Sequence, residues 1–266
     1  MSISSTFLDG AEIRFHPAAP ELQPHVGCFW IITARAGAIM RLVPDGTTSI
    51  AFEQKLDRGF TGYLRGPLLE PAELVFSAPT TLIGVRLRPG VAFNLTRVPV
   101  HHIGRRRVPL AEFDSLHEFV SVSQHALAPD ARIALLQRLL SERLQGSSIH
   151  PVVSRALEKI HADRGCVSVA DVAVWCDTSE RHLSRVMRDW IGYGPKRYAA
   201  IVRFQQSLTG MERVPRSSMA AIATETGYFD QSHMYADVSR FAGATPGDLI
   251  ETGVSDFSKT QCDVPF

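Results

Sequence analysis

Residues 230–233, with the sequence Asp-Gln-Ser-His, form a run of four side chains that can all make hydrogen bonds. The run stands where a helical pattern begins, a place at which a helix buried in a core would carry apolar groups. A helix that starts in this way presents a polar surface suited to recognising another molecule. What it recognises depends on the elements around it.

A second set of side chains carries an excess of positive charge. Residues 179–203 contain six Lys or Arg residues against two acidic ones, a local charge of +4, whereas residues 213–240 contain three of each. The whole chain has a formal net charge of only +1. A basic strip in an otherwise balanced chain suits a polyanionic partner, although a solvated helix face has the same composition.

The composition is that of an ordinary globular protein with room for two cores. The chain has 266 residues, of which 45% are hydrophobic and 21% charged. We expect neither a signal peptide nor a membrane partner, because no cationic start precedes an apolar run and no stretch approaches ~18 apolar residues. The four cysteines form no C-x-x-C pair, which predicts reduced thiols in a cytoplasmic protein.

The first half of the chain has a β-strand pattern. Residues from about 10 to 105 are rich in proline and glycine and contain short apolar runs bounded by turn residues, which predicts a sandwich or barrel. The helical pattern that follows places four apolar side chains on one face, those of Ile133, Leu136, Leu140 and Leu144. That face either closes the N-terminal domain or pairs with a second subunit.

From Val152 onward the pattern is helical, and two pairs of short helices share one layout. Ala173 and Ala223 each follow an aliphatic residue and precede a turn residue, Asp177 or Gly227, by four positions. The small side chain lets two helices approach closely, and the turn position favours a left-handed backbone. Each pair therefore predicts a helix-turn-helix unit.

These two units lie about 50 residues apart and are joined by a long helix that begins at Pro195. In this architecture, and in the segments TSERHLSRVMRDWIGYGPKRYAAIVRFQQSL and IATETGYFDQSHMYADVSRFAGATP, residues 152–250 resemble the AraC/XylS family of bacterial transcription regulators. The resemblance implies that the second helix of each unit enters a major groove of double-stranded DNA, with the two grooves about one duplex turn apart. The polar run at 230–233 then looks like the start of a recognition helix.

The resemblance also implies which side chains touch DNA. Those that face the bases are Arg181, Ser184 and Arg185 in the first unit and Gln231, Ser232 and Tyr235 in the second. Arginine can bind guanine O6 and N7, and glutamine can bind adenine N6 and N7. The expected phosphate contacts, which position the protein without reading sequence, are Arg188, Lys196, Arg197 and Arg240.

The second unit departs from the family pattern. Ala236 stands where many relatives have an arginine, and Val238 stands where an aromatic residue is usual. Together with the balanced charge of residues 213–240, this predicts that the second unit binds DNA less strongly than the first.

Other large side chains of the two units are assigned to packing. Trp175 and Trp190 lie on apolar helix faces and are predicted to be core residues, and at least one of Tyr228 and Phe229 is expected to pack inward. A purely solvated role stays open for Arg185.

The N-terminal half resembles, less specifically, a β-rich domain found on some of these regulators, over about residues 14–112. A cupin-like barrel or a sandwich offers a ligand pocket. Asp45 lies in a turn, and alternation places Arg86 and Arg88 on one strand face, where they would bind an acidic small-molecule effector. Two surface arginines beside an edge turn are the alternative.

No catalytic signature stands out in the sequence. The histidines at 16, 25, 101 and 102 lack the His-x-His spacing of a metal-binding cupin, and Gly-x-Ser-x-Gly and phosphate-loop motifs are missing. We therefore expect no enzyme, no metal and no cofactor. A metal-dependent cupin-type enzyme is the least favoured interpretation.

The sequence thus predicts an α+β multidomain protein. Its expected parts are a β-rich regulatory domain at 1–109, a helical linker and dimerisation segment at 110–150, a DNA-binding domain at 151–252 and a tail at 253–266. The predicted function is sequence-specific transcription regulation by a protein that senses a small molecule, forms a homodimer, or does both. A ligand-independent regulator that only dimerises or binds a partner protein is the alternative. RNA polymerase is a candidate partner, and activation versus repression is left open.

Overall fold

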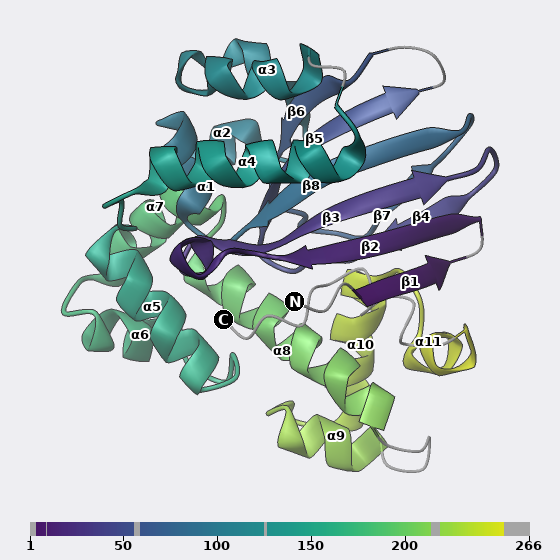
Figure 1. Ribbon diagram of the computed structural model, residues 1–266. Coiled ribbons are helices and arrows are strands. Elements are labelled where there is room, and N and C mark those ends of the chain that lie inside the picture. Colours follow the sequence, from purple (N-terminus) through teal and green to yellow (C-terminus); the bar gives the residue numbers. More distant parts are fainter. Residues whose placement is uncertain (1–3, 9, 56–58, 125–126, 214–218, 253–266) are drawn as a thin grey trace.

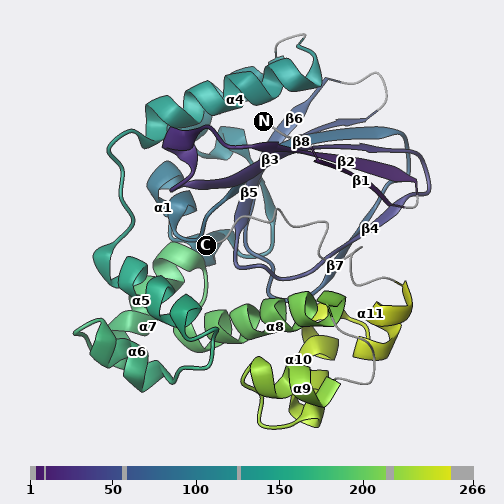
Figure 2. The same cartoon turned by 60° about the horizontal axis from the view of Figure 1, so that its bottom comes forward.

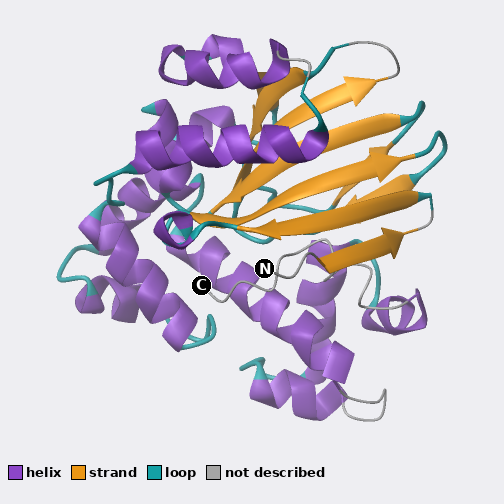
Figure 3. Ribbon diagram, viewed as in Figure 1, coloured by secondary structure: helices purple, strands orange, loops and turns teal. Residues whose placement is uncertain are grey.

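Strands dominate the first part of the chain and helices the rest (Figure 1, Figure 3). The computed structural model describes residues 4–8, 10–55, 59–124, 127–213 and 219–252. Within these ranges the structure confirms a β-rich N-terminal region followed by a helical C-terminal region.

The strands are β1 (Ser4–Leu8), β2 (Ala11–Pro17), β3 (Val26–Ala34), β4 (Ile39–Leu42), β5 (Thr48–Lys55), β6 (Thr61–Arg65), β7 (Ala72–Val75), β8 (Thr80–Leu87) and β9 (Arg107–Pro109). The helices are α1 (Val91–Thr96), α2 (Val100–Ile103), α3 (His117–Gln124), α4 (Pro129–Leu144), α5 (Pro151–Ala162), α6 (Val169–Trp175), α7 (Glu180–Ile191), α8 (Pro195–Arg213), α9 (Met219–Glu225), α10 (Gln231–Ala242) and α11 (Pro246–Thr252).

The N-terminal region is built on one seven-stranded antiparallel sheet with the order β1-β2-β3-β8-β5-β6-β9. β4 and β7 form a separate two-stranded sheet, called the ribbon below. Helices α3 and α4 cover one face of the large sheet (Figure 1), and the ribbon covers part of the other (Figure 2). The central strands β3 and β8 are mostly apolar because both of their faces are covered.

Helix α4 carries the amphipathic pattern expected from the sequence. Its apolar face is buried in the same core as the large sheet, and that face consists of Ile133, Leu136, Leu140 and Leu144. Of the two roles that the sequence leaves open for this face, the structure shows closure of the N-terminal domain. A dimer through this segment would have to use other side chains.

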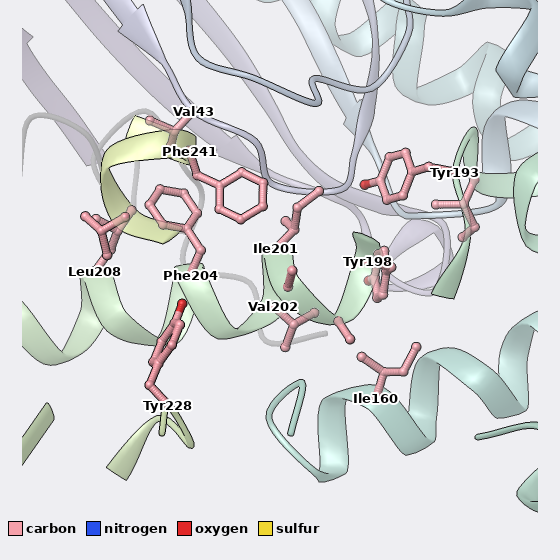
Figure 4. Packing of buried hydrophobic residues seen from close by; sticks show 14 of the residues in the cluster. Val43, Ile160, Tyr193, Tyr198, Ile201, Val202, Phe204, Leu208, Tyr228 and Phe241 are labelled. Carbon is pink, nitrogen blue, oxygen red and sulfur yellow. The ribbon is translucent and has the colours of Figure 1, made fainter. Parts of the chain in front are cut away.

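Helix α8 is the axis of the helical region. It contacts α5 and α7 on one side and α9 and α10 on the other. Figure 4 shows its apolar side chains meeting those of its neighbours, for example Phe204 against Phe241 with ring centroids 5.2 Å apart. One continuous core therefore joins the two pairs of short helices.

The N-terminal region rests on α8 through two loops, 43–47 and 66–71. Val43 belongs to the helical core (Figure 4), and Gln205 of α8 donates a hydrogen bond to the carbonyl oxygen of Pro44. Gly46 has a φ of +78°, and a Cβ atom there would lie 2.9 Å from the ring of Tyr198. The close approach of this loop to α8 therefore requires a glycine.

The cysteines do not all follow the prediction of reduced thiols. Cys166 and Cys176 are free, but Cys28 is disulfide-bonded. Cys262 lies outside the described residues. Spacing along the sequence carries no signal for a pairing that tertiary structure creates.

The first turn of α8 holds a buried polar contact. The hydroxyl group of Tyr198, which is buried, lies 2.8 Å from Nε2 of His161 on α5. Burial, reinforced by the positive charge of Arg88, lowers the pKa of His161 from 6.5 to about 4. The neutral imidazole is therefore the form that the folded protein favours.

We predict that part of the free energy of unfolding is lost as the pH falls from 6.5 to about 4. In this interval the unfolded chain takes up a proton at His161 whereas the folded chain does not, a difference of roughly 3 kcal/mol when complete. Urea unfolding at several pH values measures it. The variant His161→Gln, which can still hydrogen-bond Tyr198, should have a shallower pH slope, and equal slopes in both proteins would contradict the prediction.

Candidate nucleic-acid interface

Both pairs of short helices adopt the predicted helix-turn-helix geometry. In the first, α6 and α7 meet at Asp177, which has a φ of +50°, and in the second, α9 and α10 meet at Gly227, which has a φ of +73°. Ala173 and Ala223 are buried where the helices approach each other. The left-handed turns expected from the sequence are therefore present in both units.

The second helix of each unit begins with a side-chain cap. The hydroxyl oxygen of Ser179 accepts a hydrogen bond from the backbone N–H of His182 at 3.2 Å. A carboxylate oxygen of Asp230 accepts one from the N–H of His233 at 2.7 Å. Asp230, the first residue of the polar run, therefore stabilises the helix start, and Gln231 and Ser232 stay exposed.

The predicted base-facing side chains of α7 share one exposed face. Arg181 and Arg185 are exposed and Ser184 is partly buried. At 100° per residue the three positions span about 100° of the helix circumference. The opposite face, with Leu183 and Val186, is buried in the helical core.

Arg185 is not a freely solvated side chain. One terminal nitrogen of its guanidinium group lies 3.2 Å from Nδ1 of His182, and the other lies 3.8 Å from a carboxylate oxygen of Asp189. These neighbours, one turn away on either side, hold the guanidinium group along the exposed face of α7. His182 thus helps to orient a side chain that is predicted to contact the bases.

The exposed face of α10 differs in charge from that of α7. Gln231, Ser232 and Ala236 are exposed, and Tyr235 is partly buried against the helical core. The helix carries one arginine, Arg240, in its last turn. This supports the predicted asymmetry between the two units.

The four predicted phosphate contacts fall into two classes. Arg188 and Lys196 are exposed. Arg197 is instead part of the domain junction, where its guanidinium group donates a hydrogen bond to the carbonyl oxygen of Leu69 and lies 4.9 Å from the ring of Phe241. Arg197 is thus engaged within the protein, and a phosphate contact by this residue stays a prediction.

Arg240 is also engaged within the protein. Its guanidinium group lies 2.8 Å from the buried carboxylate of Asp237 and 4.4 Å from the ring of Phe241. The same carboxylate lies 3.7 Å from Arg203 of α8. Arg240 is half exposed and its charge is matched by Asp237, so a phosphate contact by this residue stays a prediction.

One aromatic residue, Trp175, does not lie in the core as predicted. Trp175 is 50% exposed, and the ammonium group of Lys159 lies 5.3 Å from its ring. The seven-residue helix α6 is too short to bury more than one narrow face, and Trp175 lies outside that face. Tyr228 packs inward as expected, whereas its neighbour Phe229 is 93% exposed.

The third aromatic residue, Trp190, connects α7 to the N-terminal region. Its ring centroid lies 4.4 Å from that of Phe93 in α1, and Nδ1 of His101 in α2 lies 3.4 Å from the carboxylate of Asp189. No sequence pattern indicates these two contacts, which join residues 97 and 88 positions apart. The first recognition helix therefore rests on α1 and α2.

The three predicted effector residues are not all brought together. Arg86 and Asp45 form a salt bridge of 3.4 Å, with side chains 16% and 17% exposed. Arg88 lies beyond the end of β8, where its Nε donates a hydrogen bond to the carbonyl oxygen of Gln23 at 2.7 Å. A residue that was missed, Arg65 of β6, lines the same cavity as Arg86. No local pattern marks Arg65, because its position depends on the pairing of β6 with β5.

Other classes of site find little support in the described part of the chain. There, no group of three or more His, Cys, Asp or Glu side chains could hold a metal ion. No helix in the same ranges has the length and apolar character needed to cross a membrane.

We predict that Asp230→Ala lowers the free energy of unfolding of the full chain by about 1 kcal/mol, because the N–H of His233 loses its capping acceptor. The neighbouring exposed residue Gln231 serves as a matched control. Gln231→Ala should change the free energy of unfolding by less than about 0.5 kcal/mol. Urea unfolding at pH 7 measures both. Equal losses in the two variants would contradict the capping role.

Comparison with known proteins adds two domain assignments. Residues 172–252 match the model of a helix-turn-helix domain, and residues 14–109 match that of a domain of unknown function, DUF6597. No curated protein matches the chain.

Solved structures that resemble it include those of ToxT from Vibrio cholerae. ToxT of strain O395 has 9% sequence identity and a TM-score of 0.44, with 92% of this chain and 98% of that chain covered. The same protein bound to (E)-4-(8-methylnaphthalen-1-yl)but-3-enoic acid has 10% identity and a TM-score of 0.46, with coverages of 83% and 97%. At this distance the assignment depends on the domain match and on the two units described above. Residues 172–252 form an AraC-type helix-turn-helix domain, which follows a β-rich N-terminal region.

Proposed function

We propose that the two helix-turn-helix units bind two successive major grooves on one face of double-stranded DNA in the bacterial cytoplasm. The observation that carries this proposal is the pairing of two equivalent units on one helix, α8, each with a capped second helix whose polar face is exposed. A rigid connection of this kind suits grooves that repeat every ~10–10.5 base pairs.

The first unit supplies most of the affinity in this proposal. Arg181, Ser184 and Arg185 face the bases, and the exposed Arg188 and Lys196 neutralise phosphates. The second groove is contacted by Gln231, Ser232 and Tyr235. Electrostatic attraction to DNA is weaker there, since α10 exposes no arginine on that face.

The N-terminal region regulates this activity by holding both recognition helices. α7 contacts α1 and α2, and Gly243, which ends α10, lies against Pro71 beside the ribbon. A small molecule that binds more tightly to one arrangement of these contacts would shift the fraction of chains in the conformation that binds DNA. A ligand-independent regulator that uses this region only to dimerise or to bind a partner protein is the second candidate. Homodimerisation and a contact with RNA polymerase stay predictions.

Selection of bound duplexes from a random DNA pool, with the full chain at moderate salt, tests the proposal. The expected result is two short conserved blocks about one helical turn apart, the second weaker than the first. The double variant Arg181→Ala/Arg185→Ala should lose one block and Gln231→Ala/Ser232→Ala the other, while Arg41→Ala on the ribbon should keep both. Failure to enrich any site, or one block that survives both double variants, would refute the two-groove arrangement.

Two single substitutions should separate base contacts from phosphate contacts. We predict that Arg185→Ala costs about 1–3 kcal/mol of discrimination at one base pair, because a bidentate contact is lost. Lys196→Ala should weaken binding to all duplexes alike and reduce the slope of log K against log salt by about 1. Titrations of matched and mismatched duplexes at several salt concentrations measure both effects. Identical behaviour of the two variants would contradict the assigned roles.

A further inference from the structure

A cavity of about 70 Å³ lies between the large sheet and the ribbon. Most of its wall is apolar and includes Trp30, Met40, Leu42, Leu74 and Leu82. Its polar groups are mainly Ser49, Arg65 and Arg86, and these also line a smaller adjoining cavity of about 50 Å³ that reaches Asp45. The cavity is therefore apolar along its length and positively charged at one end.

Strand register explains why the polar groups lie together. Ser49 of β5 is paired with Arg65 of β6 on one side and with Arg86 of β8 on the other. Cross-strand partners project from the same face of a sheet, so two guanidinium groups flank the hydroxyl group of Ser49. Ser49, Arg65 and Arg86 thus form a row of polar side chains on the face of the sheet that is turned toward the ribbon.

The charges in the row do not balance. Asp45 forms a salt bridge with Arg86 at 3.4 Å. Glu53, the nearest acidic residue along β5, lies 3.4 Å from Arg107. Within the described ranges, no hydrogen bond or salt bridge engages the guanidinium group of Arg65, and burial lowers its pKa. A partly buried cation without a paired anion is unfavourable, and a bound anion would relieve it.

The size and the charge of the site restrict its ligand. One unmatched cation favours a monoanion over a phosphate dianion, and a carboxylate matches the planar guanidinium fork. The cavity is about half the size of the roughly 150 Å³ apolar cavity that admits benzene, so the apolar part of the ligand has to be compact. Within the described residues the ribbon pairs with no strand of the large sheet and packs on it through side chains, so admitting a short tail would break no strand pairing between them.

We propose that this cavity binds a small monocarboxylate, with the carboxylate between Arg65 and Arg86 and a short apolar tail against Trp30 and Leu82. The proposal rests on the regulatory role proposed for the N-terminal region. A carboxylate that competes for Arg86 weakens the hold on Asp45, and Asp45 adjoins Gly46, which contacts Tyr198 at the start of α8. Binding of a ligand in the cavity would thus alter the contact between this loop and α8, the helix that carries both DNA-binding units.

Thermal unfolding of the full chain in sodium butyrate, with sodium chloride at matched ionic strength as the reference, tests the site. Butyrate should raise Tm in a saturable way by a few degrees. Butyramide, which has nearly the same shape and no charge, should leave Tm unchanged. Arg65→Gln should weaken the butyrate response at least tenfold, and the control Arg41→Gln, an exposed arginine on the outside of the ribbon, should respond as the wild type does.

Several results would overturn the site. These are the absence of a saturable response to butyrate, an equal response to butyramide, and an unchanged response in Arg65→Gln. Should Arg65→Gln fail to fold, Ala51→Leu decides, because it fills the cavity and keeps both arginines, so that a full butyrate response in it would also refute the site.

DNA binding is measured in parallel on the selected duplex. A wild-type chain that binds DNA and ignores butyrate refutes the ligand site alone. A chain that binds butyrate and selects no DNA refutes the proposed function, and with it the regulatory consequence of the site.

Discussion

The arrangement of this protein depends on the burial of the start of α8 against the N-terminal region. Tyr193 and Tyr198 are both buried there, and the hydroxyl group of Tyr198 lies 2.8 Å from Nε2 of His161, whose pKa burial lowers to about 4. The loop at 43–47 reaches the ring of Tyr198 only because Gly46 has no side chain. Since α8 carries both helix-turn-helix units, this one contact places them with respect to the β-rich region.

The same region contacts each unit a second time. Trp190 and Asp189, at the end of α7, meet α1 and α2, and the end of α10 meets the loop that leads into the ribbon. In both units the C-terminal end of the recognition helix is therefore held by the N-terminal region, and the N-terminal end is left exposed. A structural change in the N-terminal region can therefore alter the positions of α7 and α10 directly.

Local patterns predicted the parts of the structure that depend on local physics. The left-handed turns at Asp177 and Gly227 and the apolar face of α4 follow from residue type and spacing, and all are observed. The position of the polar run at 230–233 was recognised, although its first member proved to be a cap.

Features made by contacts between distant segments could not be found in this way. The resemblance implies a phosphate contact for Arg197, but it does not indicate the hydrogen bond to Leu69, which lies 128 positions away. Trp175 looked like a core residue because its helix is apolar, but that helix is too short to bury two faces. Arg65 lies near Arg86 because β6 and β8 both pair with β5.

Methylation interference on the duplex selected by the full chain is the most direct test of the central claim, that the two units on α8 enter successive major grooves on one face. Methylation of guanine N7 blocks major-groove contacts and leaves the minor groove unaffected. The account predicts interference in two clusters separated by ~10–10.5 base pairs, with the second weaker. A single cluster, or two clusters on opposite faces of the duplex, would contradict it.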